Sequence, residues 1–440
     1  MEAFLMKALQ LILSLSILVV VHEFGHYIFA RMFKIRVEKF YLFFDAGFAL
    51  FRYKPKNSHT EYGVGWLPLG GYVKIAGMID ESMDTDQMSQ PPQPWEFRSK
   101  PAWQRLLVMI AGVVFNLLLA FFIYAMVLFT WNDTYLPLRN ITQGMEFSQA
   151  AQNAGFQDGD ILLKADDKVL ERFGVRTLLD VADAREVTVL RDGKETVLPM
   201  QAGLMQSLLT DKEGFAAYRV PPVVYETMEG SAAASAGLIR GDSIVAVNGA
   251  ATPLFSNLRE ALDLHRDDEV VIDYYRAGTL QSTTARVDSL GTLGFYAMSA
   301  PQIYGTVTLS YGFFESFPAG INMGIQTLKD YVAQFKYVFT KEGASSLGGF
   351  GAIGNLFPAQ WNWQAFWLMT AFLSVILAFM NILPIPALDG GHVMFLIYEV
   401  VSRRKPNEKF MEYAQVAGMV LLLGLVLYAN GMDVVRAIFN

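Results

Sequence analysis

Four long apolar stretches run along the chain, separated by more polar segments of very different length. Each stretch is close to or above the roughly 20 residues that a helix needs to cross the hydrocarbon core of a bilayer. We therefore predict four transmembrane helices. The first is not a typical signal peptide, because its basic cluster follows the apolar run instead of preceding it. The predicted spans are about Phe4 to Phe33, about Leu106 to Trp131, roughly Phe366 to Leu388 and roughly Ala414 to Ile438.

Basic residues gather in the short segments on one side of these spans. Such residues mark the cytoplasmic side of membrane proteins. The pattern predicts that both termini and the long segment between the second and third spans lie outside the cytoplasm. The residues are Arg31, Lys34, Arg36 and Lys39 after the first span, Arg98, Lys100 and Arg105 before the second, and Arg403, Arg404, Lys405 and Lys409 between the third and fourth.

The long segment between spans two and three contains an internal repeat. An Ala-Gly-apolar triplet followed by Gly-Asp begins at Ala154 and again at Ala236. Each copy continues into an apolar strand and then a turn pair, Asp166-Asp167 or Asn248-Gly249, as expected where φ must become positive. We predict two tandem domains of one small β-rich fold. The pattern resembles PDZ domains, a family that binds extended peptides at a sheet edge.

Two shorter regions have their own character. Residues 47–76 carry glycine and aromatic residues at a spacing typical of short strands beside the membrane. Residues 311–339 are aromatic-rich and amphipathic, which is typical of helices that lie in the membrane interface. The expected domains are residues 1–131 with the first two spans and the glycine-rich segment, 132–212 and 213–305 as the two PDZ domains, 306–362 as amphipathic interfacial helices, and 363–440 with the last two spans.

The first span contains the pattern His-Glu-x-x-His at residues 22–26. Residues four apart lie on one face of a helix, so His22 and His26 can bind one metal ion. Glu23 is rotated by about 100° and is placed to act on a water beside the metal. The alternative is two core histidines in a buried salt bridge, but an ionisable residue inside a membrane costs about 2.5–3.5 kcal/mol. We therefore predict a catalytic metal site, with zinc as the ion.

A catalytic zinc needs a third protein ligand and an open position. The end of the third span is the best source, because Pro384 and Pro386 interrupt the helix and free backbone groups at membrane depth. Asp389 and His392 follow, and the residue types alone leave both open as the ligand. The remaining histidines, His59 and His265, stand in polar sequence and are expected to be ordinary surface residues.

Composition narrows the class of protein further. Apolar residues make up 53% of the chain and charged residues 18%, which indicates a membrane protein with a soluble part. The chain has no cysteine, so disulfides and thiolate ligands are excluded. The formal net charge is −7 and no basic tract or nucleic-acid motif is present, so a nucleic-acid partner is not expected.

Taken together, these motifs resemble the site-2 protease family, of the bacterial regulator of sigma-E protease type, over nearly the whole chain. The motifs are His-Glu-x-x-His, the glycine-rich segment, the tandem repeat and Asn-x-x-Pro-x-Pro-x-Leu-Asp-Gly from Asn381. One departure is Gly112-Val113-Val114-Phe115-Asn116, where the family commonly has Gly-Pro-x-x-Asn.

The resemblance implies Asp389 as the third ligand and Asn381 as a substrate contact. It also implies a membrane-associated β-hairpin that carries the substrate-binding glycines Gly63, Gly65, Gly70 and Gly71. The expected fold is a multi-domain membrane protein, with an α-helical catalytic core of four transmembrane helices and two extracytoplasmic PDZ domains.

The function implied is intramembrane proteolysis of single-span proteins after prior trimming, with anti-sigma factors and remnant signal peptides as substrate classes. The resemblance places the protein in a bacterial inner membrane, with the active site towards the cytoplasm. The PDZ domains either bind peptide or exclude substrates with large outer domains. Two other classes of function compete with this one. A membrane-anchored PDZ scaffold has no use for Glu23 beside the ligands, and a metal transporter needs ligands spread along a path.

Overall fold

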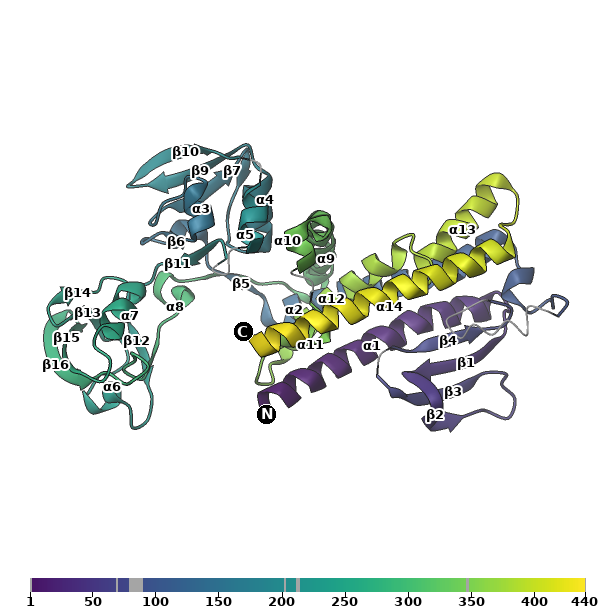
Figure 1. The fold of residues 1–440 in the computed structure, drawn as a ribbon, viewed down its shortest axis with the longest axis horizontal. Helices are drawn as coiled ribbons and strands as arrows, with labels where there is room; N and C mark the ends of the chain where they lie inside the picture. The colour runs from purple at the N-terminus through teal and green to yellow at the C-terminus, as the bar shows by residue number, and fades with distance from the viewer. Residues whose placement is uncertain are drawn as a thin grey trace. The chain divides into compact units, whose positions relative to one another are not determined.

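The computed structural model describes residues 2–68, 70–78, 90–201, 203–210, 214–345 and 348–439. The chain forms two compact units (Figure 1). One combines residues 1–132 with residues 310–440 and contains the long helices. The other, residues 133–309, is rich in β-strands.

Among the described residues, four helices of the first unit are long and apolar enough to cross a membrane, so the chain is a membrane protein. They are α1 (Glu2–Met32), α2 (Ala102–Trp131), α12 (Trp363–Ile382) and α14 (Glu408–Phe439). Helix α2 packs against both α1 and α12. Close approach to α1 depends on Gly25, because a Cβ atom there would lie 2.6 Å from the Ala111 carbonyl oxygen.

The third span differs from its predicted extent. Helix α12 ends at Ile382, six residues before the predicted end of the span at Leu388, and a new helix, α13 (Asp389–Ser402), begins directly after Leu388. The intervening residues 383–388 are irregular, because a proline cannot donate the helical hydrogen bond and disfavours the helical conformation of the residue before it. Ala387 adopts a positive φ of 76°, which a residue with a side chain rarely takes.

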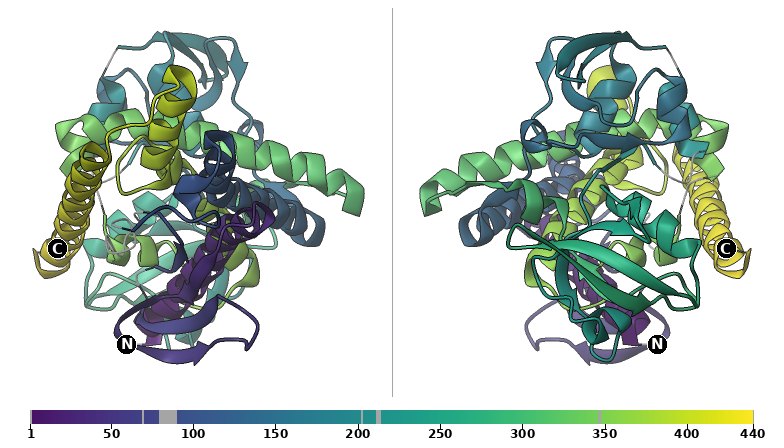
Figure 2. Two further views of the ribbon diagram at one scale, coloured as in Figure 1. Left: turned by 90° about the vertical axis from the view of Figure 1, so that its right-hand side faces the viewer. Right: turned by 90° about the vertical axis from the view of Figure 1, so that its left-hand side faces the viewer.

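The amphipathic region folds into a long helix, α9 (Phe313–Phe335), that lies crosswise to the spans. Figure 1 views it end on, whereas Figure 2 shows it lengthwise. Gly320 and Gly324 let α9 approach α2 closely, since a Cβ at Gly320 would lie 2.4 Å from the Ala125 nitrogen. Short helices follow: η3 (Lys336–Phe339), α10 (Lys341–Ser345) and α11 (Phe350–Asn355).

The glycine-rich region forms a four-stranded sheet in the order β2-β3-β1-β4. The strands are β1 (Val37–Leu42), β2 (Phe44–Tyr53), β3 (Glu61–Leu67) and β4 (Tyr72–Ile75), and η1 (Phe97–Ser99) precedes α2. The expected β-hairpin is therefore only part of the structure. β2 and β3 pair as a hairpin, but β3 also pairs in parallel with β1, and β1 pairs with β4.

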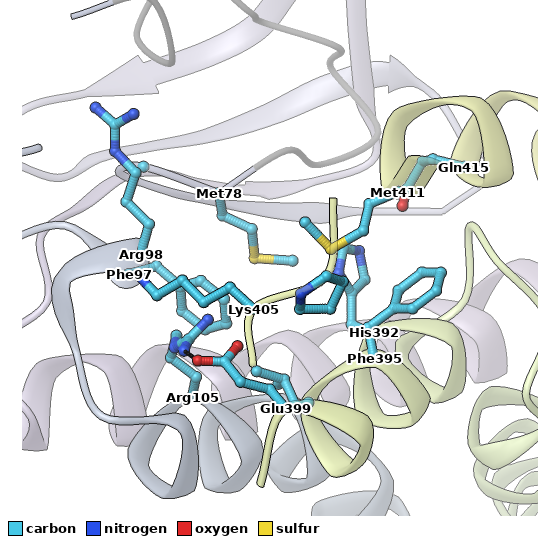
Figure 3. A pocket seen from close by; sticks show the side chains of 13 residues that line it. Met78, Phe97, Arg98, Arg105, His392, Phe395, Glu399, Lys405, Met411 and Gln415 are labelled. Atoms are coloured by element: carbon cyan, nitrogen blue, oxygen red, sulfur yellow. Dashed lines mark hydrogen bonds and ion pairs between the residues drawn. The ribbon is translucent and has the colours of Figure 1, made fainter. Parts of the chain in front are cut away.

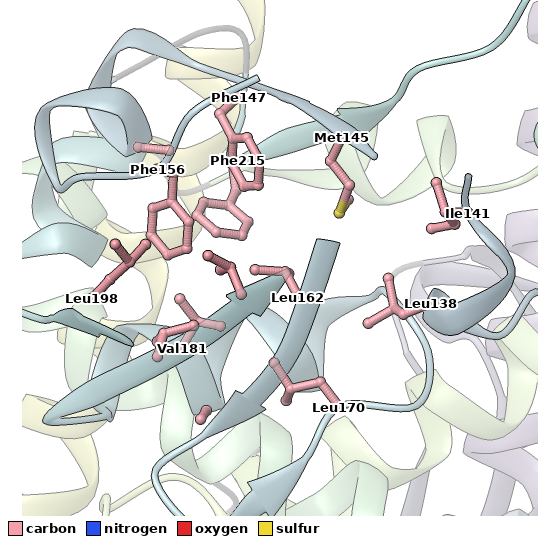
Figure 4. Close-up of a cluster of buried hydrophobic side chains, with 14 of the residues drawn as sticks. Leu138, Ile141, Met145, Phe147, Phe156, Leu162, Leu170, Val181, Leu198 and Phe215 are labelled. Carbon is pink, nitrogen blue, oxygen red and sulfur yellow. The ribbon is translucent and has the colours of Figure 1, made fainter. Parts of the chain in front are cut away.

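The second unit contains two repeats with the same strand order, β8-β7-β9-β10 and β14-β13-β15-β16. Figure 4 shows the core of the first, which includes Phe156, Leu162 and Phe215. The elements of the first repeat are β6 (Met145–Phe147), α3 (Gln149–Asn153), β7 (Ile161–Ala165), β8 (Lys168–Val169), α4 (Val175–Asp183), β9 (Glu186–Arg191), β10 (Lys194–Pro199), α5 (Leu204–Thr210) and β11 (Ala216–Tyr218). Those of the second are β12 (Val224–Thr227), α6 (Ala232–Ser235), β13 (Ser243–Val247), β14 (Ala250–Ala251), α7 (Phe255–Asp263), β15 (Glu269–Arg276), β16 (Thr279–Arg286) and β17 (Phe295–Ala297).

The repeated Gly-Asp motif has the same role in both copies. Asp160 accepts two hydrogen bonds from Arg191, at 2.8 and 2.7 Å, and Asp242 accepts two from Arg276, at 2.8 and 2.6 Å. Each carboxylate therefore ties the start of one strand to the end of another across the sheet. Bidentate arginine–carboxylate pairs of this kind are among the stronger hydrogen-bonded contacts in proteins.

The second repeat is inserted within the first. Strand β11 pairs with β6 of the first repeat, so residues 216–218, which the sequence assigned to the second domain, pair with the first. Helix α8 (Ala300–Tyr304) returns to the first core, where Ala300 is buried. The chain enters and leaves the unit through β5 (Asp133–Tyr135) and β18 (Val307–Leu309), which pair with each other, and η2 (Leu138–Asn140) follows β5.

Candidate metal centre

The two imidazoles of the His-Glu-x-x-His pattern lie side by side on α1. His22 and His26 are one helical turn apart and both are buried, with 7% and 6% of their surface exposed. Their Nε2 atoms are 3.2 Å apart. Glu23 lies between them in sequence and is half-buried.

Asp389, the first residue of α13, completes the group. Its Oδ2 atom lies 3.1 Å from His22 Nε2 and 3.3 Å from His26 Nε2. The two glycines that follow let the first turn of this helix pack tightly against the preceding segment. A Cβ at Gly390 would lie 2.1 Å from the Leu383 carbonyl oxygen, and one at Gly391 would lie 2.7 Å from the Ile385 carbonyl oxygen.

Helix α2 forms a further wall of this centre through residues four apart. The Val108 carbonyl oxygen lies 2.9 Å from His26 Nδ1, and the Asn116 amide nitrogen lies 3.1 Å from His22 Nδ1. Between them stands Gly112, where a Cβ would lie 2.4 Å from His26 Nε2 and 2.9 Å from His22 Nε2. The absence of a side chain at Gly112 therefore leaves space in front of both imidazoles.

These residues fit a metal ion. Two imidazole nitrogens and one carboxylate oxygen converge, and the three ligand atoms all lie within 4.8 Å of one another. The Asp389 Oδ2 atom is buried, and the groups beside it are the two imidazole Nε2 atoms at 3.1 and 3.3 Å. A buried carboxylate oxygen needs a partner, and a cation held between it and the two nitrogens supplies one. Two histidines and one carboxylate form a ligand set found in catalytic zinc sites.

The other histidines lie elsewhere. His392 lies one turn after Asp389 on α13 and lines a different cavity of about 120 Å³, with Met78, Phe395 and Met411 (Figure 3). In the same cavity Arg105 donates to Glu399 at 2.5 Å, which ties α2 to α13. His59 is exposed and His265 is half-exposed, as the polar sequence around them indicated.

The predicted substrate-binding residues are not all in one place. Asn381 is half-buried at the end of α12, two residues before the irregular segment that leads to Asp389. Gly63 and Gly65 lie in β3, an inner strand, where a Cβ would meet Tyr41 and the Phe44 backbone. Both positions require glycine for packing within the sheet.

Gly70 and Gly71 lie just before β4, at the edge of the sheet. A Cβ at Gly71 would lie 2.7 Å from Val19 Cγ1. Val19 is three residues before His22 on α1, so this end of β4 lies close to the helix that carries the histidines.

Two contributors to the centre had no signal in the sequence. The Val108 carbonyl is a backbone group, and Ser374 of α12 donates to the Asn116 carbonyl oxygen at 2.7 Å from a fully buried position. Gly112 and Asn116 were visible as a motif, but their closeness to the histidines is a tertiary contact.

The chain is similar over nearly its whole length to known proteases. The pattern of the family described as Peptidase family M50 matches residues 10–425. A putative zinc metalloprotease of Vibrio cholerae is 28% identical over 99% of this chain and 100% of its own length. Metalloprotease MmpA of Caulobacter vibrioides is 27% identical, over 99% and 97%. Protease RseP of Yersinia pestis is 28% identical, over 97% and 98%. The chain therefore belongs to peptidase family M50, the family of the site-2 proteases.

Proposed function

We propose that this protein is an intramembrane zinc endopeptidase in which His22, His26 and Asp389 bind the metal and Glu23 is the general base. The observation that carries the proposal is the convergence of two buried imidazole nitrogens and one buried carboxylate oxygen, from two separate helices, within 3.3 Å. The relative from Vibrio cholerae is named a putative zinc metalloprotease, and this ligand set agrees with that name.

The reaction is hydrolysis of a peptide bond. Bound zinc supplies a Lewis acid that lowers the pKa of water and polarises a peptide carbonyl. Glu23 accepts the proton of the attacking water and delivers it to the amide nitrogen that leaves. Asn381, close in sequence to Asp389, holds the substrate backbone near the scissile bond.

The first test is cleavage of a tagged single-span substrate by the purified protein in detergent. Glu23→Gln should lower the rate by about 10²–10⁴-fold, the usual contribution of a general base, while zinc content stays at one per chain. If the wild type cuts the substrate and the zinc-loaded Glu23→Gln variant does not, the protein is a metalloprotease that uses Glu23. Equal cleavage by both proteins rules out Glu23 as the base. Bound zinc without cleavage of any single-span substrate favours the scaffold alternative.

The substrates proposed are single-span membrane proteins that another protease has already trimmed, such as anti-sigma factors, and remnant signal peptides. The setting is regulated intramembrane proteolysis in a bacterial inner membrane. The basic residues near the ends of α1, α2 and α13 favour an orientation with these ends in the cytoplasm and residues 133–309 outside. The active site then faces the cytoplasmic half of the membrane.

A substrate helix has to unwind before its carbonyls can be attacked, and we propose that it does so by adding a strand to the sheet. Among the described strands of this sheet, β2 and β4 form the edges, so pairing along β3 would require β2 or β1 to leave. β4 is favoured, because Gly71 at its start contacts α1 one turn before His22.

Cysteine cross-linking tests this route against a clean background, since the chain has no cysteine. In the zinc-loaded Glu23→Gln protein, a cysteine at Lys74 of β4 should form a disulfide with cysteines near the cleavage site of the substrate. A cysteine at Arg52 of β2, on the opposite edge, is the matched control. Cross-linking through Arg52→Cys alone would assign the substrate to β2.

A further inference from the structure

We propose that Asn116 is a positioning residue that fixes His22 as the tautomer with hydrogen on Nδ1, so that Nε2 faces the metal. This inference rests on the proposed ligand set. It concerns a residue on α2, which contributes no ligand of its own. It also gives a chemical reason for an asparagine in the middle of a membrane-spanning helix.

Asn116 is fully buried and its amide faces His22. The amide nitrogen lies 3.1 Å from His22 Nδ1, and the Asn116 Oδ1 atom is buried with no hydrogen-bond partner in the described part of the chain. Rotation of the amide by half a turn about χ2 exchanges its nitrogen and oxygen. The oxygen then lies beside His22 Nδ1 and gains the partner that it lacks.

The chemistry of a metal-bound imidazole selects this rotated orientation. A neutral imidazole carries hydrogen on one nitrogen and a lone pair on the other. When Nε2 binds a metal, Nδ1 carries the hydrogen and requires an acceptor, and such acceptors orient ligand histidines in metal sites. An amide N–H at Nδ1 would instead face another N–H.

His26 provides the internal comparison. Its Nδ1 lies 2.9 Å from the Val108 carbonyl oxygen, an acceptor that cannot rotate into a donor. Val108 and Asn116 stand one turn before and one turn after Gly112, on one face of α2. The same helix face thus supplies an acceptor for each histidine, one from the backbone and one from a side chain.

The backbone of Asn116 is held by a third helix, α12. Ser374 Oγ, fully buried on α12, donates to the Asn116 carbonyl oxygen at 2.7 Å. This hydrogen bond ties the turn of α2 at Asn116 to α12. The side chain therefore projects from a fixed point, as a positioning residue requires.

The test is the zinc dissociation constant of the full-length protein in detergent, measured by competition with a chelator. Asn116→Leu keeps the shape but removes the acceptor, and it should weaken zinc binding about 10–100-fold. Asn116→Asp keeps an acceptor and should bind zinc at least as tightly as the wild type. Thr370→Val is the matched control, because Thr370 is equally buried but its hydroxyl donates only to the Phe366 carbonyl oxygen, within α12.

A second readout separates positioning from packing. With Co²⁺ in place of zinc, the visible absorption spectrum should change in Asn116→Leu and stay close to wild type in Thr370→Val. Wild-type affinity in Asn116→Leu, or equal weakening in both Asn116 variants, would overturn the assignment. His22→Phe serves as the reference. If that variant binds zinc as wild type does, the ligand set itself is wrong, which is a different failure.

Discussion

Gly112 shows how much a single missing side chain determines at the metal centre. A Cβ at this position would lie 2.4 Å from His26 Nε2 and 2.9 Å from His22 Nε2. Zinc–imidazole bonds are about 2.0–2.1 Å long, so the added methyl group would compete with the ion for one space. The atoms that overlap are those of the two imidazole rings, so relieving the overlap displaces the ligands themselves.

We therefore expect Gly112→Ala to weaken zinc binding by at least the roughly 100-fold loss typical of strong perturbations around a metal. Metal content after dialysis and chelator competition measure this directly. Gly424→Ala on α14 is the control, because a Cβ there meets nothing within 4 Å. Zinc binding of Gly112→Ala at wild-type strength would show that the ion lies elsewhere.

For single residues, the sequence predicted which residue types bind the metal better than it predicted where they lie in the fold. The His-Glu-x-x-His pattern defines its own arrangement, because a helix brings His22 and His26 onto one face. The choice between Asp389 and His392 remained open on residue type, since it depends on where α13 begins. Only the fold shows that Asp389 meets the two histidines while His392 lines a separate cavity.

Single carboxylates stabilise the elements of each repeat. Burial raises the pKa of Asp242, whereas hydrogen bonds from Arg276 and from the Ile239 N–H lower it, and the result is a pKa below the ordinary value for the carboxyl. The stabilisation is therefore complete above the unfolded-state pKa of about 3.9. It is lost as the pH falls through the lower folded-state pKa.

We expect Asp242→Asn to destabilise the second repeat at pH 7 by about 1.5–3 kcal/mol, the range for hydrogen bonds to charged groups. The variant should also lose part of the acid sensitivity of the wild type below about pH 4. Limited proteolysis of the full-length protein, with thermolysin at pH 7 for the first effect and with pepsin between pH 4 and 2.5 for the second, measures them when cleavage sites are mapped within residues 220–299. Asp263→Asn removes only an exposed pair with Arg266 and should behave as wild type.

The elements that the sequence failed to predict depend on contacts distant in the chain. The four spans followed from apolar length, and the repeat followed from its motif. The parallel pairing of β1 with β3 did not, because a parallel pair has no tight turn to mark it and β1 overlaps the basic cluster at Lys39. The early end of α12 was visible in Pro384 and Pro386, but apolar residues beyond them extended the predicted span.

For the whole molecule, the paired strands β5 and β18 define where residues 133–309 join the helical unit. The two strands pair from Asp133 with Leu309 to Tyr135 with Val307. The ends of this unit are therefore adjacent, and a short linker between Asn132 and Ser310 can replace it. A deletion of Met145 to Leu290 would instead remove β6 but leave α8, which packs against the core of the first repeat.

If this unit excludes substrates with large outer domains, its deletion should allow cleavage of untrimmed substrate. We expect the protein lacking residues 133–309 to cut a single-span substrate with a folded outer domain, which the full-length protein rejects. Both should cut the trimmed form, and the same deletion carrying Glu23→Gln should cut neither. Continued rejection of the large substrate by the deletion protein would contradict size exclusion and favour peptide binding by the repeats.

Because the second repeat is inserted in the first, the two repeats differ in how easily evolution or an experimenter can delete or replace them. The chain leaves the first copy after β11 and returns to it at α8, so the second copy is continuous and the first is split. One excision between Arg219 and Ala300 would remove the second copy as a whole, whereas no single excision removes the first alone. The second repeat can thus be removed or exchanged without interrupting the first. A shortened version of this protein should therefore retain the first repeat and lack the second.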